Sequence, residues 1–487
     1  MDETKTTCDY CNCDVCDKVR SDLEKIFRVL DIYGWLLDSY IVDFFLEDLW
    51  NKLPGEWQNT LDVVSPQELG KWILGEACER VWPLSLMALR EVIRSLVINR
   101  NHNEGEAIKC KKRSSEGKSF NSLEELDSVN SNLYVNDSKF NNLFIKHVKT
   151  KKRYEIEKMS QILGDCALKA NCKCVVDIGA GMGHLARVLA FKYGFSVTCV
   201  EQDPLLTAQA KKCDEQFLTS LRKYNPNCNG KLQHVSMTVN VNDSGEEVVN
   251  YLTKSFESEQ TLITKRKELG LVGLHPCGDL ATTLLRLYSN CAEAKFICIV
   301  GCCYMKLTRS GDKFALKGYP MSQYVSTLDN NEISFNALEV SCHAMEKHCD
   351  KLKEERFSDL IVHTYRAALE YMLVQKSSKL RRIQVNSVKV KNGMCFEQYC
   401  KAAVANLEPH KQPEDFYYTQ PKIIQFLSEW NRVLVFGSLR LMLAPLVETC
   451  VLLDRFLFLS EKKLGPSLKA EFDCRVSPRN FVLISSK

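Results

Sequence analysis

The first stretch in which residue types and spacing could do chemistry is a run of glycines at every second position. In "VVDIGAGMGHLARVLA" (175–190), Gly179, Gly181 and Gly183 follow Asp177. The valines before the aspartate predict a buried strand, and the apolar run after the glycines predicts a helix. A strand, a glycine turn and a helix in this order are typical of a nucleotide-binding site. A tight turn without a ligand is the alternative interpretation.

The residues around these glycines distinguish between nucleotides. Glu201 ends the next predicted strand, where a carboxylate can accept both hydroxyls of a ribose. The dinucleotide pattern G-x-G-x-x-G requires Gly or Ala at position 184, where this chain has His184. The pattern D-x-G-x-G-x-G is instead usual for S-adenosylmethionine (SAM), which needs bare backbone against its aminoacyl and ribose parts. We therefore predict SAM as the cofactor, in preference to NAD, with the ligand residues Asp177, Gly179, Gly181, Gly183 and Glu201.

A second candidate region is "GLHPCGDLATT" (273–283), at the end of a later predicted strand. His275 is a candidate general base, because its unperturbed pKa is near neutrality. Cys277 is a candidate thiolate nucleophile, and Asp279 could orient either group. Two of them have a named structural alternative: Asp279 as a helix N-cap and Cys277 as a small packing residue. These three are the candidate catalytic residues.

The end of the following strand, "GCCYMKLT" (301–308), carries further polar groups. Tyr304 could stack on a base and Lys306 could meet a phosphate. Cys302 and Cys303 are interpreted as buried thiols, because adjacent cysteines cannot easily ligate one ion. An Asn-Pro-Pro-Tyr motif is absent from both strand ends, which argues against N-methylation of adenine or glutamine.

Cysteines also gather near the start of the chain, in "CDYCNCDVC". Cys8 with Cys11 and Cys13 with Cys16 form two C-x-x-C pairs that suit zinc. The single residue between the pairs is crowded for one tetrahedral ion, and no histidine is near, so no metal site is predicted. The chain has 23 cysteines and no secretory signal at its start. This combination predicts free thiols in a reducing compartment, the cytoplasm or the nucleus.

The elements around these motifs alternate in type. Apolar strands are predicted at "CVVDI", "FSVTCVE", "LQHVSMTV", "LVGLH" and "FICIVGCCY", with helices over 150–170, 183–193 and 204–224 and from Asp279. This alternation predicts an α/β fold, a Rossmann-like parallel sheet covered by helices on both faces. Ligands of such sheets bind at the carboxyl ends of the strands. Asp177, Glu201, His275 and Gly301 are therefore expected near one edge.

The remaining chain predicts added helices. The expected segments are a polar tail (1–20), a helical region (21–99), a linker (100–140), the SAM-binding core (141–345), a helical region (346–470) and a hairpin (471–487). The hairpin strands are expected at "EFDCRV" and "FVLISS", returning antiparallel to the sheet.

The apolar run 433–459 is interrupted by Arg440 and Glu448, and its charge-free parts are shorter than the roughly 18 residues of a membrane span. A packed helix is predicted there.

The distribution of Lys and Arg along the chain bears on which molecules the protein binds. The net charge of +4 is mild, but 146–158 and 376–391 are rich in Lys and Arg. These two basic runs are either solvated helix faces or surfaces that contact a phosphate backbone.

Seven stretches together resemble the methyltransferase-like protein 25 family, in its shorter branch named for a ribosomal RNA adenine dimethylase domain. They are "DLWNKLPGEW", "VVDIGAGMGHLAR", "GLHPCGDLATT", "VGCCYMKLT", "YRAALE", "LRLMLAPLVETCVLLDRFLF" and "SPRNFVL". The resemblance implies a class I SAM-dependent methyltransferase with added helices, and it implies the same five SAM ligands. His275-x-Cys277-Gly278 is also similar to an element of a tRNA 2′-O-methyltransferase family.

The sequence therefore predicts a SAM-dependent methyltransferase that acts on RNA. A SAM-binding scaffold that holds a protein partner through its helical regions is one alternative. A protein or small-molecule methyltransferase is another.

Overall fold

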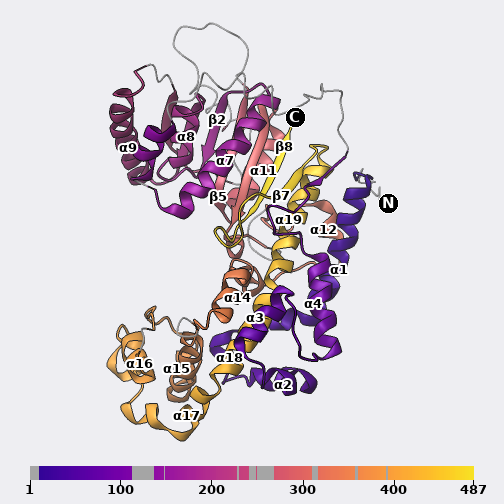
Figure 1. The fold of residues 1–487 in the computed structure, drawn as a ribbon, viewed down its shortest axis with the longest axis vertical. Helices are drawn as coiled ribbons and strands as arrows, with labels where there is room; N and C mark the ends of the chain where they lie inside the picture. Colours follow the sequence, from indigo (N-terminus) through magenta and orange to yellow (C-terminus); the bar gives the residue numbers. More distant parts are fainter. Residues whose placement is uncertain are drawn as a thin grey trace, which may run out of the picture. The chain divides into compact units, whose positions relative to one another are not determined.

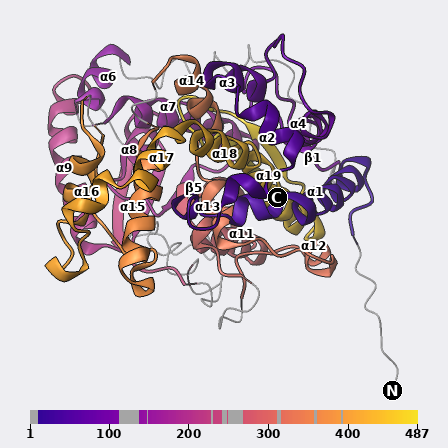
Figure 2. The ribbon, with the colours of Figure 1, turned by 90° about the horizontal axis from the view of Figure 1, so that it is seen from below.

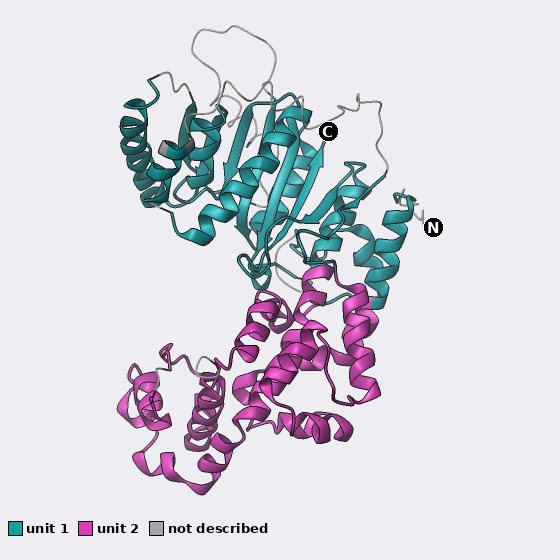
Figure 3. Cartoon of the chain, viewed as in Figure 1, with its two compact units in different colours: residues 1–25, 99–332, 450–487 teal, residues 26–98, 333–449 magenta. Residues whose placement is uncertain are grey.

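The structure is a computed structural model that describes residues 10–111, 137–146, 148–226, 230–240, 248, 268–309, 316–356, 360–390 and 393–487. The chain folds into two compact units (Figure 3). Unit 1 comprises Met1–Lys25, Asn99–Glu332 and Cys450–Lys487, and unit 2 comprises Ile26–Ile98 and Ile333–Thr449. Each unit is therefore assembled from segments that lie far apart in the sequence.

Unit 1 contains a sheet of eight described strands in the order β1-β7-β8-β6-β5-β2-β3-β4 (Figure 1). Their bounds are β1 (Ile108–Lys109), β2 (Cys174–Ile178), β3 (Ser196–Glu201), β4 (Lys231–Ser236), β5 (Leu269–Cys277), β6 (Ala294–Cys302), β7 (Ser467–Ala470) and β8 (Phe481–Ser486). Strands β4, β3, β2, β5 and β6 are parallel, and β8, β7 and β1 pair antiparallel. The predicted α/β fold of a class I methyltransferase is confirmed.

Helices cover both faces of this sheet, as its apolar strands require. On one face, α6 (Asp137–Ile145), α7 (Thr150–Lys169), α8 (His184–Phe191) and the end of α9 (Pro204–Arg222) form one buried cluster with the alternate strand residues Val175, Val197 and Val272. On the other face, α11 (Asp279–Asn290) packs on β5, where a side chain at Gly273 would meet Leu284 at 2.9 Å. The carboxyl ends of β2, β3, β5 and β6 therefore meet at one edge.

The antiparallel hairpin at the end of the chain is confirmed, but its first strand is not where the sequence predicted it. Residues 471–476, expected as a strand, form a turn after β7. The Asp473 carboxylate accepts the Arg475 N–H at 2.8 Å, and its carbonyl accepts the N–H groups of Val476 and Ser477. An aspartate that bonds the backbone two residues onward favours a turn over a strand, which explains the difference.

Unit 2 is helical in the residues that the structure describes. Its helices are most of α1 (Asp14–Asp38), α2 (Gly55–Leu61), α3 (Pro66–Leu74), α4 (Leu84–Leu96), α13 (Phe335–Val340), α14 (Met345–Lys353), α15 (Val362–Lys376), α16 (Phe396–Val404), α17 (Pro421–Ser428), α18 (Trp430–Met442) and the start of α19 (Ala444–Glu461). Helices α15, α16 and α17 lie side by side around an apolar cluster (Figure 2). Helix α1 begins at Asp14, inside the segment expected as a tail.

The apolar run 433–459 forms parts of two helices, α18 and α19, rather than one. Among the described helices, none has the length and apolar character needed to cross a membrane. The remaining short helix of unit 1 is α12 (Gln323–Thr327).

Candidate functional site

The glycine turn joins β2 to α8 at the carboxyl edge of the sheet. Gly179, Gly181 and Gly183 have φ values of +75°, +55° and +67°. This left-handed conformation favours glycine over residues with a side chain. The N–H of Gly179 donates to the Val200 carbonyl at 2.8 Å, which ties the turn to the end of β3. A Cβ added at Gly181 would meet no atom within 4 Å, so the middle of the turn faces open space.

Glu201 ends β3 beside this turn. Its two carboxylate oxygens accept the N–H of Gly181 at 2.9 Å and the N–H of Asp203 at 3.1 Å. The carboxylate therefore orients the turn in addition to facing the site. Each oxygen keeps a second lone pair, so a role toward ligand hydroxyls stays open to it.

Asp177 lies at the end of β2 and is only 3% exposed. Burial raises the pKa of its carboxyl to about 7, against the smaller opposing effects of Lys152 and His234. A carboxyl with such a pKa gains from a cation that approaches it. The raised pKa follows from the burial of the carboxyl.

A buried ion-pair network supports the glycine turn, and the sequence analysis did not predict it. The Asp214 carboxylate accepts from Arg187 at 2.7 Å and contacts the His234 ring nitrogen Nε2 at 2.5 Å. Arg187 also donates to the Met182 carbonyl within the turn at 3.1 Å. A Cβ at Gly183 would meet His234 at 2.8 Å, so this glycine allows the close approach. Arg187 falls on a buried helix face, where a charged residue is rare unless it is paired.

His275 lies near the end of β5 and faces α7. Its Nε2 is 3.0 Å from Glu155 Oε1, and Glu155 also accepts from Ser477 Oγ at 2.6 Å. Burial works to raise the pKa of Glu155, but the hydrogen bonds and charges of His275, Ser477 and Lys151 together outweigh it and lower this pKa to about 2. Glu155 is thus a charged, buried partner of His275. Glu155 and His275 lie far apart in the sequence, so no local motif could have predicted this pair.

The backbone at His275 is unusual. Its φ is +69°, and the pairing of β5 with β6 shifts register between Leu274 and Cys277. Left-handed backbone in a non-glycine residue concentrates at functional sites, and a bulge re-aims a side chain. Both features direct His275 toward Glu155, and its side chain stays 21% exposed.

The other two catalytic candidates have different surroundings. Cys277 is exposed rather than packed, and its sulfur lies 3.4 Å from that of Cys302. Gly278 is the N-cap of α11, so Asp279 is not the cap. The Asp279 carboxylate instead accepts the Thr308 N–H at 3.0 Å, which anchors the segment after β6. These contacts give Asp279 a structural role.

The residues at and after the end of β6 do not all have the surroundings that the sequence predicted. Tyr304 is 1% exposed, with Arg455 and Arg479 at 5.5 and 5.6 Å from its ring centre. It cannot stack on a ligand in this position, and the prediction that it does is wrong. Cys302 is buried as interpreted, and burial raises the pKa of its thiol, whereas Cys303 is only half-buried, contrary to the interpretation.

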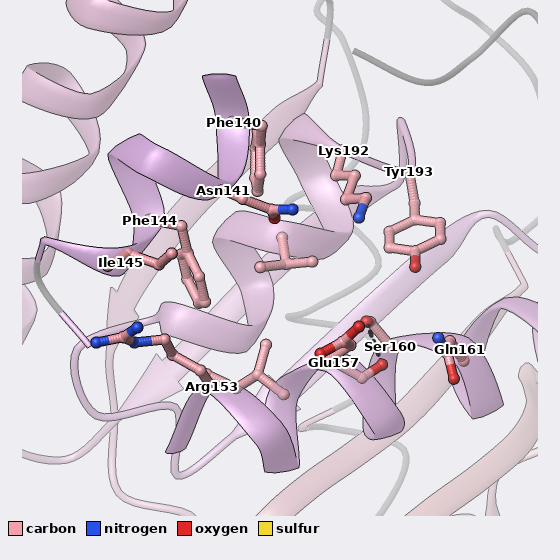
Figure 4. A pocket seen from close by; sticks show the side chains of 12 residues that line it. Phe140, Asn141, Phe144, Ile145, Arg153, Glu157, Ser160, Gln161, Lys192 and Tyr193 are labelled. Carbon is pink, nitrogen blue, oxygen red and sulfur yellow. Dashed lines mark hydrogen bonds between the residues drawn. The ribbon is translucent and has the colours of Figure 1, made fainter. Parts of the chain in front are cut away.

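A pocket of about 230 Å³ opens elsewhere in unit 1, between α6, α7 and α8 (Figure 4). Phe140 and Phe144 line it together with the polar side chains of Arg153, Glu157 and Lys192. No residue of the glycine turn and no residue of β5 lines it. The pocket is therefore separate from the strand ends.

The two basic runs belong to different units. The run 146–158 lies at the start of α7, where Lys151 is 3.6 Å from Glu155. In the run 376–391, Arg381 and Arg382 both pair with the fully buried Asp43, at 3.0 and 2.9 Å. Two of the cations in the second run are therefore engaged within unit 2.

Comparisons with known proteins agree with this geometry. A family model described as a methyltransferase domain matches residues 151–310. The probable methyltransferase-like protein 25 of Mus musculus is 23% identical over 465 residues, covering 70% of this chain and 76% of the relative. Its Homo sapiens namesake is 29% identical over 236 residues, 45% of this chain and 36% of the relative. The chain is therefore similar to these two probable methyltransferase-like proteins, and about a third of it matches a methyltransferase domain.

Solved structures resemble the chain only distantly. The plantazolicin methyltransferase BpumL in complex with SAH is 11% identical, with a TM-score of 0.20, and the match covers 63% of this chain and 93% of that one. Similarity at this level carries no conclusion about function. The methyltransferase class is supported by the domain match and by the sequence relatives.

Proposed function

We propose that unit 1 binds SAM at the glycine turn and transfers its methyl group to a hydroxyl of an RNA acceptor. The methyltransferase domain matched at 151–310 supports the reaction class. The observation that carries the proposal is the bare turn at Gly181, which faces open space between the acids Asp177 and Glu201. Backbone without side chains next to two carboxyls suits a ligand that is both flat and cationic.

The residues present fit SAM. Glu201 holds the turn open through Gly181 and retains lone pairs for hydroxyl groups. Asp177, whose pKa burial raises to about 7, favours a positive charge nearby. When bound, SAM supplies an electrophilic methyl group on a sulfonium. The chain's part is to position it, and positioning provides much of the rate gain in such transfers.

His275 would act as the general base on the acceptor side. With Nε2–H donating to the Glu155 carboxylate, Nδ1 is left as a proton acceptor. The acceptor oxygen would bond to the methyl carbon as the bond from that carbon to the sulfonium breaks, which releases S-adenosylhomocysteine. The hydroxyl proton would move to Nδ1, and Glu155 would stabilise the imidazolium. A hydroxyl acceptor needs such a base more than an amine does, which favours a hydroxyl as the modified group.

RNA as the acceptor is supported by charge at the same edge. Lys149 and Lys151 are exposed at the start of α7, the helix that carries Glu155. The charge of Lys152 acts on Asp177. Cations next to the strand ends suit a phosphate backbone. Because Arg381 and Arg382 pair with Asp43, the run 376–391 adds little to this support.

The experiment is methyl transfer from labelled SAM to fractionated cell RNA and protein. Label in RNA is expected for the wild type, with loss in both Gly181→Arg and His275→Ala. Calorimetry should show that Gly181→Arg no longer binds SAM, whereas His275→Ala still does. Label found only in protein would overturn the RNA acceptor. Absence of SAM binding by the wild type would overturn the whole proposal.

A further inference from the structure

Four cysteines from two distant segments meet at one place in unit 1. Cys11, Cys13 and Cys16 lie at or before the first turn of α1, and Cys110 follows β1 directly. Their sulfur atoms all lie within 4.8 Å of one another. The sulfur of Cys110 is 3.5 Å from that of Cys11 and 3.7 Å from that of Cys16.

These separations match those of a four-sulfur tetrahedron around one ion. A zinc–sulfur bond of about 2.3 Å places the sulfurs of a tetrahedron about 3.8 Å apart. An iron–sulfur cluster contains several irons and holds its cysteine sulfurs farther apart than this group allows. The geometry therefore fits a single ion with four thiolate ligands.

We propose that Cys11, Cys13, Cys16 and Cys110 bind one zinc ion as a structural site. Four protein ligands leave no open position for water or substrate, which is the arrangement of structural zinc. The ion would join the start of α1 to β1, and so to the edge of the sheet. This site is independent of the proposed methyl transfer.

The contacts around the cysteines already hold the two segments together. The Arg20 guanidinium donates twice to the Cys11 carbonyl, both at 3.0 Å, and lies over the rings of Tyr10 and Tyr324. The Cys110 N–H donates to the Pro466 carbonyl at 3.0 Å. Such second contacts orient the groups that bind a metal.

Backbone N–H groups also face one of the sulfurs. The N–H groups of Cys16 and Lys111 donate to the sulfur of Cys13. Lys111 follows Cys110 and is 3.4 Å from Asp14 in α1. The two cysteine segments are thus bridged by side chains and backbone alike.

The structure answers the objection raised by the sequence, because the sulfurs of Cys11 and Cys13 lie within 4.8 Å of each other despite the single residue between them. Crowding was expected for Cys8, Cys11, Cys13 and Cys16, and Cys8 lies outside the described residues. With Cys110 as the fourth ligand, 94 residues beyond Cys16, only three of the clustered cysteines are needed. No spacing rule applied to the N-terminal segment alone could select Cys110.

The test is metal analysis of the full chain, purified without a metal-affinity tag. We expect about one zinc per chain in the wild type, lost in Cys110→Ser and in Cys13→Ser. Cys8→Ser and Cys213→Ser are the controls and should keep it. Cobalt in place of zinc should give the intense visible bands of a tetrahedral thiolate site. Removing zinc from the wild type with a chelator should lower the melting temperature, and added zinc should restore it.

Three results would overturn the proposal. They are a wild-type chain without stoichiometric zinc, full zinc retention by a folded Cys110→Ser variant, and loss of zinc in Cys8→Ser. The last would place Cys8 in the ligand set. The cobalt spectrum and the chelator experiment use the wild type, so misfolding of a variant cannot decide the outcome.

Discussion

The glycine turn and the His275 region lie at the same edge of one sheet, and they are built in opposite ways. The turn is made by contiguous residues, with Glu201 only one strand away. His275 depends on Glu155 from α7 and on Ser477 from the segment between β7 and β8. A cofactor common to many enzymes can be held by a local motif, whereas an acceptor site is assembled from distant parts. The following experiments test whether the glycine turn and the His275 region have these separate roles.

The largest effect on SAM binding is expected from Gly181→Arg. The new side chain must adopt φ +55° and fill the open space at the turn, so SAM affinity should fall at least about 100-fold, or about 2.8 kcal/mol. Gly194→Arg is the matched control, because Gly194 also has positive φ and open space but follows α8 at its far end. Calorimetry should show normal SAM binding in the control. Equal loss in both variants would mean that strain, not the site, is responsible.

Glu155→Gln tests the His275 region, which is assembled from distant segments of the chain. Removing the charge leaves His275 without its anionic partner, so kcat should fall by roughly 10²–10⁴-fold, the range for a lost general base. SAM affinity should stay unchanged, and the pH profile of kcat should change shape. Asp165→Asn, an exposed acid on the same helix, is the control. A variant with the wild-type pH profile would show that Glu155 is merely structural.

The same substitution has a stability effect with a defined sign. The pKa of Glu155 is lowered in the folded state to about 2, from about 4.5. Its contribution is therefore present above pH 4.5 and lost as pH falls toward 2. Glu155→Gln should be less stable than the wild type at pH 7, with the difference shrinking in acid. Chemical unfolding at several pH values measures this.

Asp177→Asn should act in the opposite direction. The folded-state pKa is raised to about 7, so the wild type loses stability as pH rises from about 4 through 7. The variant should be more stable at pH 8, by up to about 4 kcal/mol, and equal near pH 4. Its SAM affinity should nonetheless be lower. A variant that binds SAM normally at pH 8 would remove Asp177 from the site.

The smallest effect concerns RNA. Lys149→Ala and Lys151→Ala should each reduce the salt slope of RNA binding by about 0.7, the value for one phosphate contact on a single strand. Lys379→Ala, in unit 2, should leave the slope unchanged. Arg381 and Arg382 are unsuitable for this test because they pair with Asp43. Filter binding across a salt series decides, and unchanged slopes in all variants would contradict an RNA surface on α7.

The parts predicted from the sequence share a physical basis. The strands, α8, α9 and α11 follow from hydrophobic periodicity, and the turn follows from glycines whose φ the structure shows to be positive. Contacts between distant residues leave no local pattern. Nothing in the local sequence therefore pointed to the Glu155–His275 pair, to the burial of Tyr304 or to the approach of Cys110 to Cys11. The strand expected at 471–476 does not form. The Asp473 side chain accepts the Arg475 N–H and so favours a turn, despite the strand preference of the apolar residues around it.

The position of β8 bears on how unit 1 is made in the cell. β8, residues 481–486, lies between β6 and β7, yet it is synthesised after every other strand. During synthesis on the ribosome, one edge of β6 therefore stays unpaired until more than 170 further residues have been added. Exposed strand edges bind chaperones or each other. A premature stop codon before residue 481 would leave this edge permanently open, so we expect such products to be degraded rather than to persist as shortened enzymes.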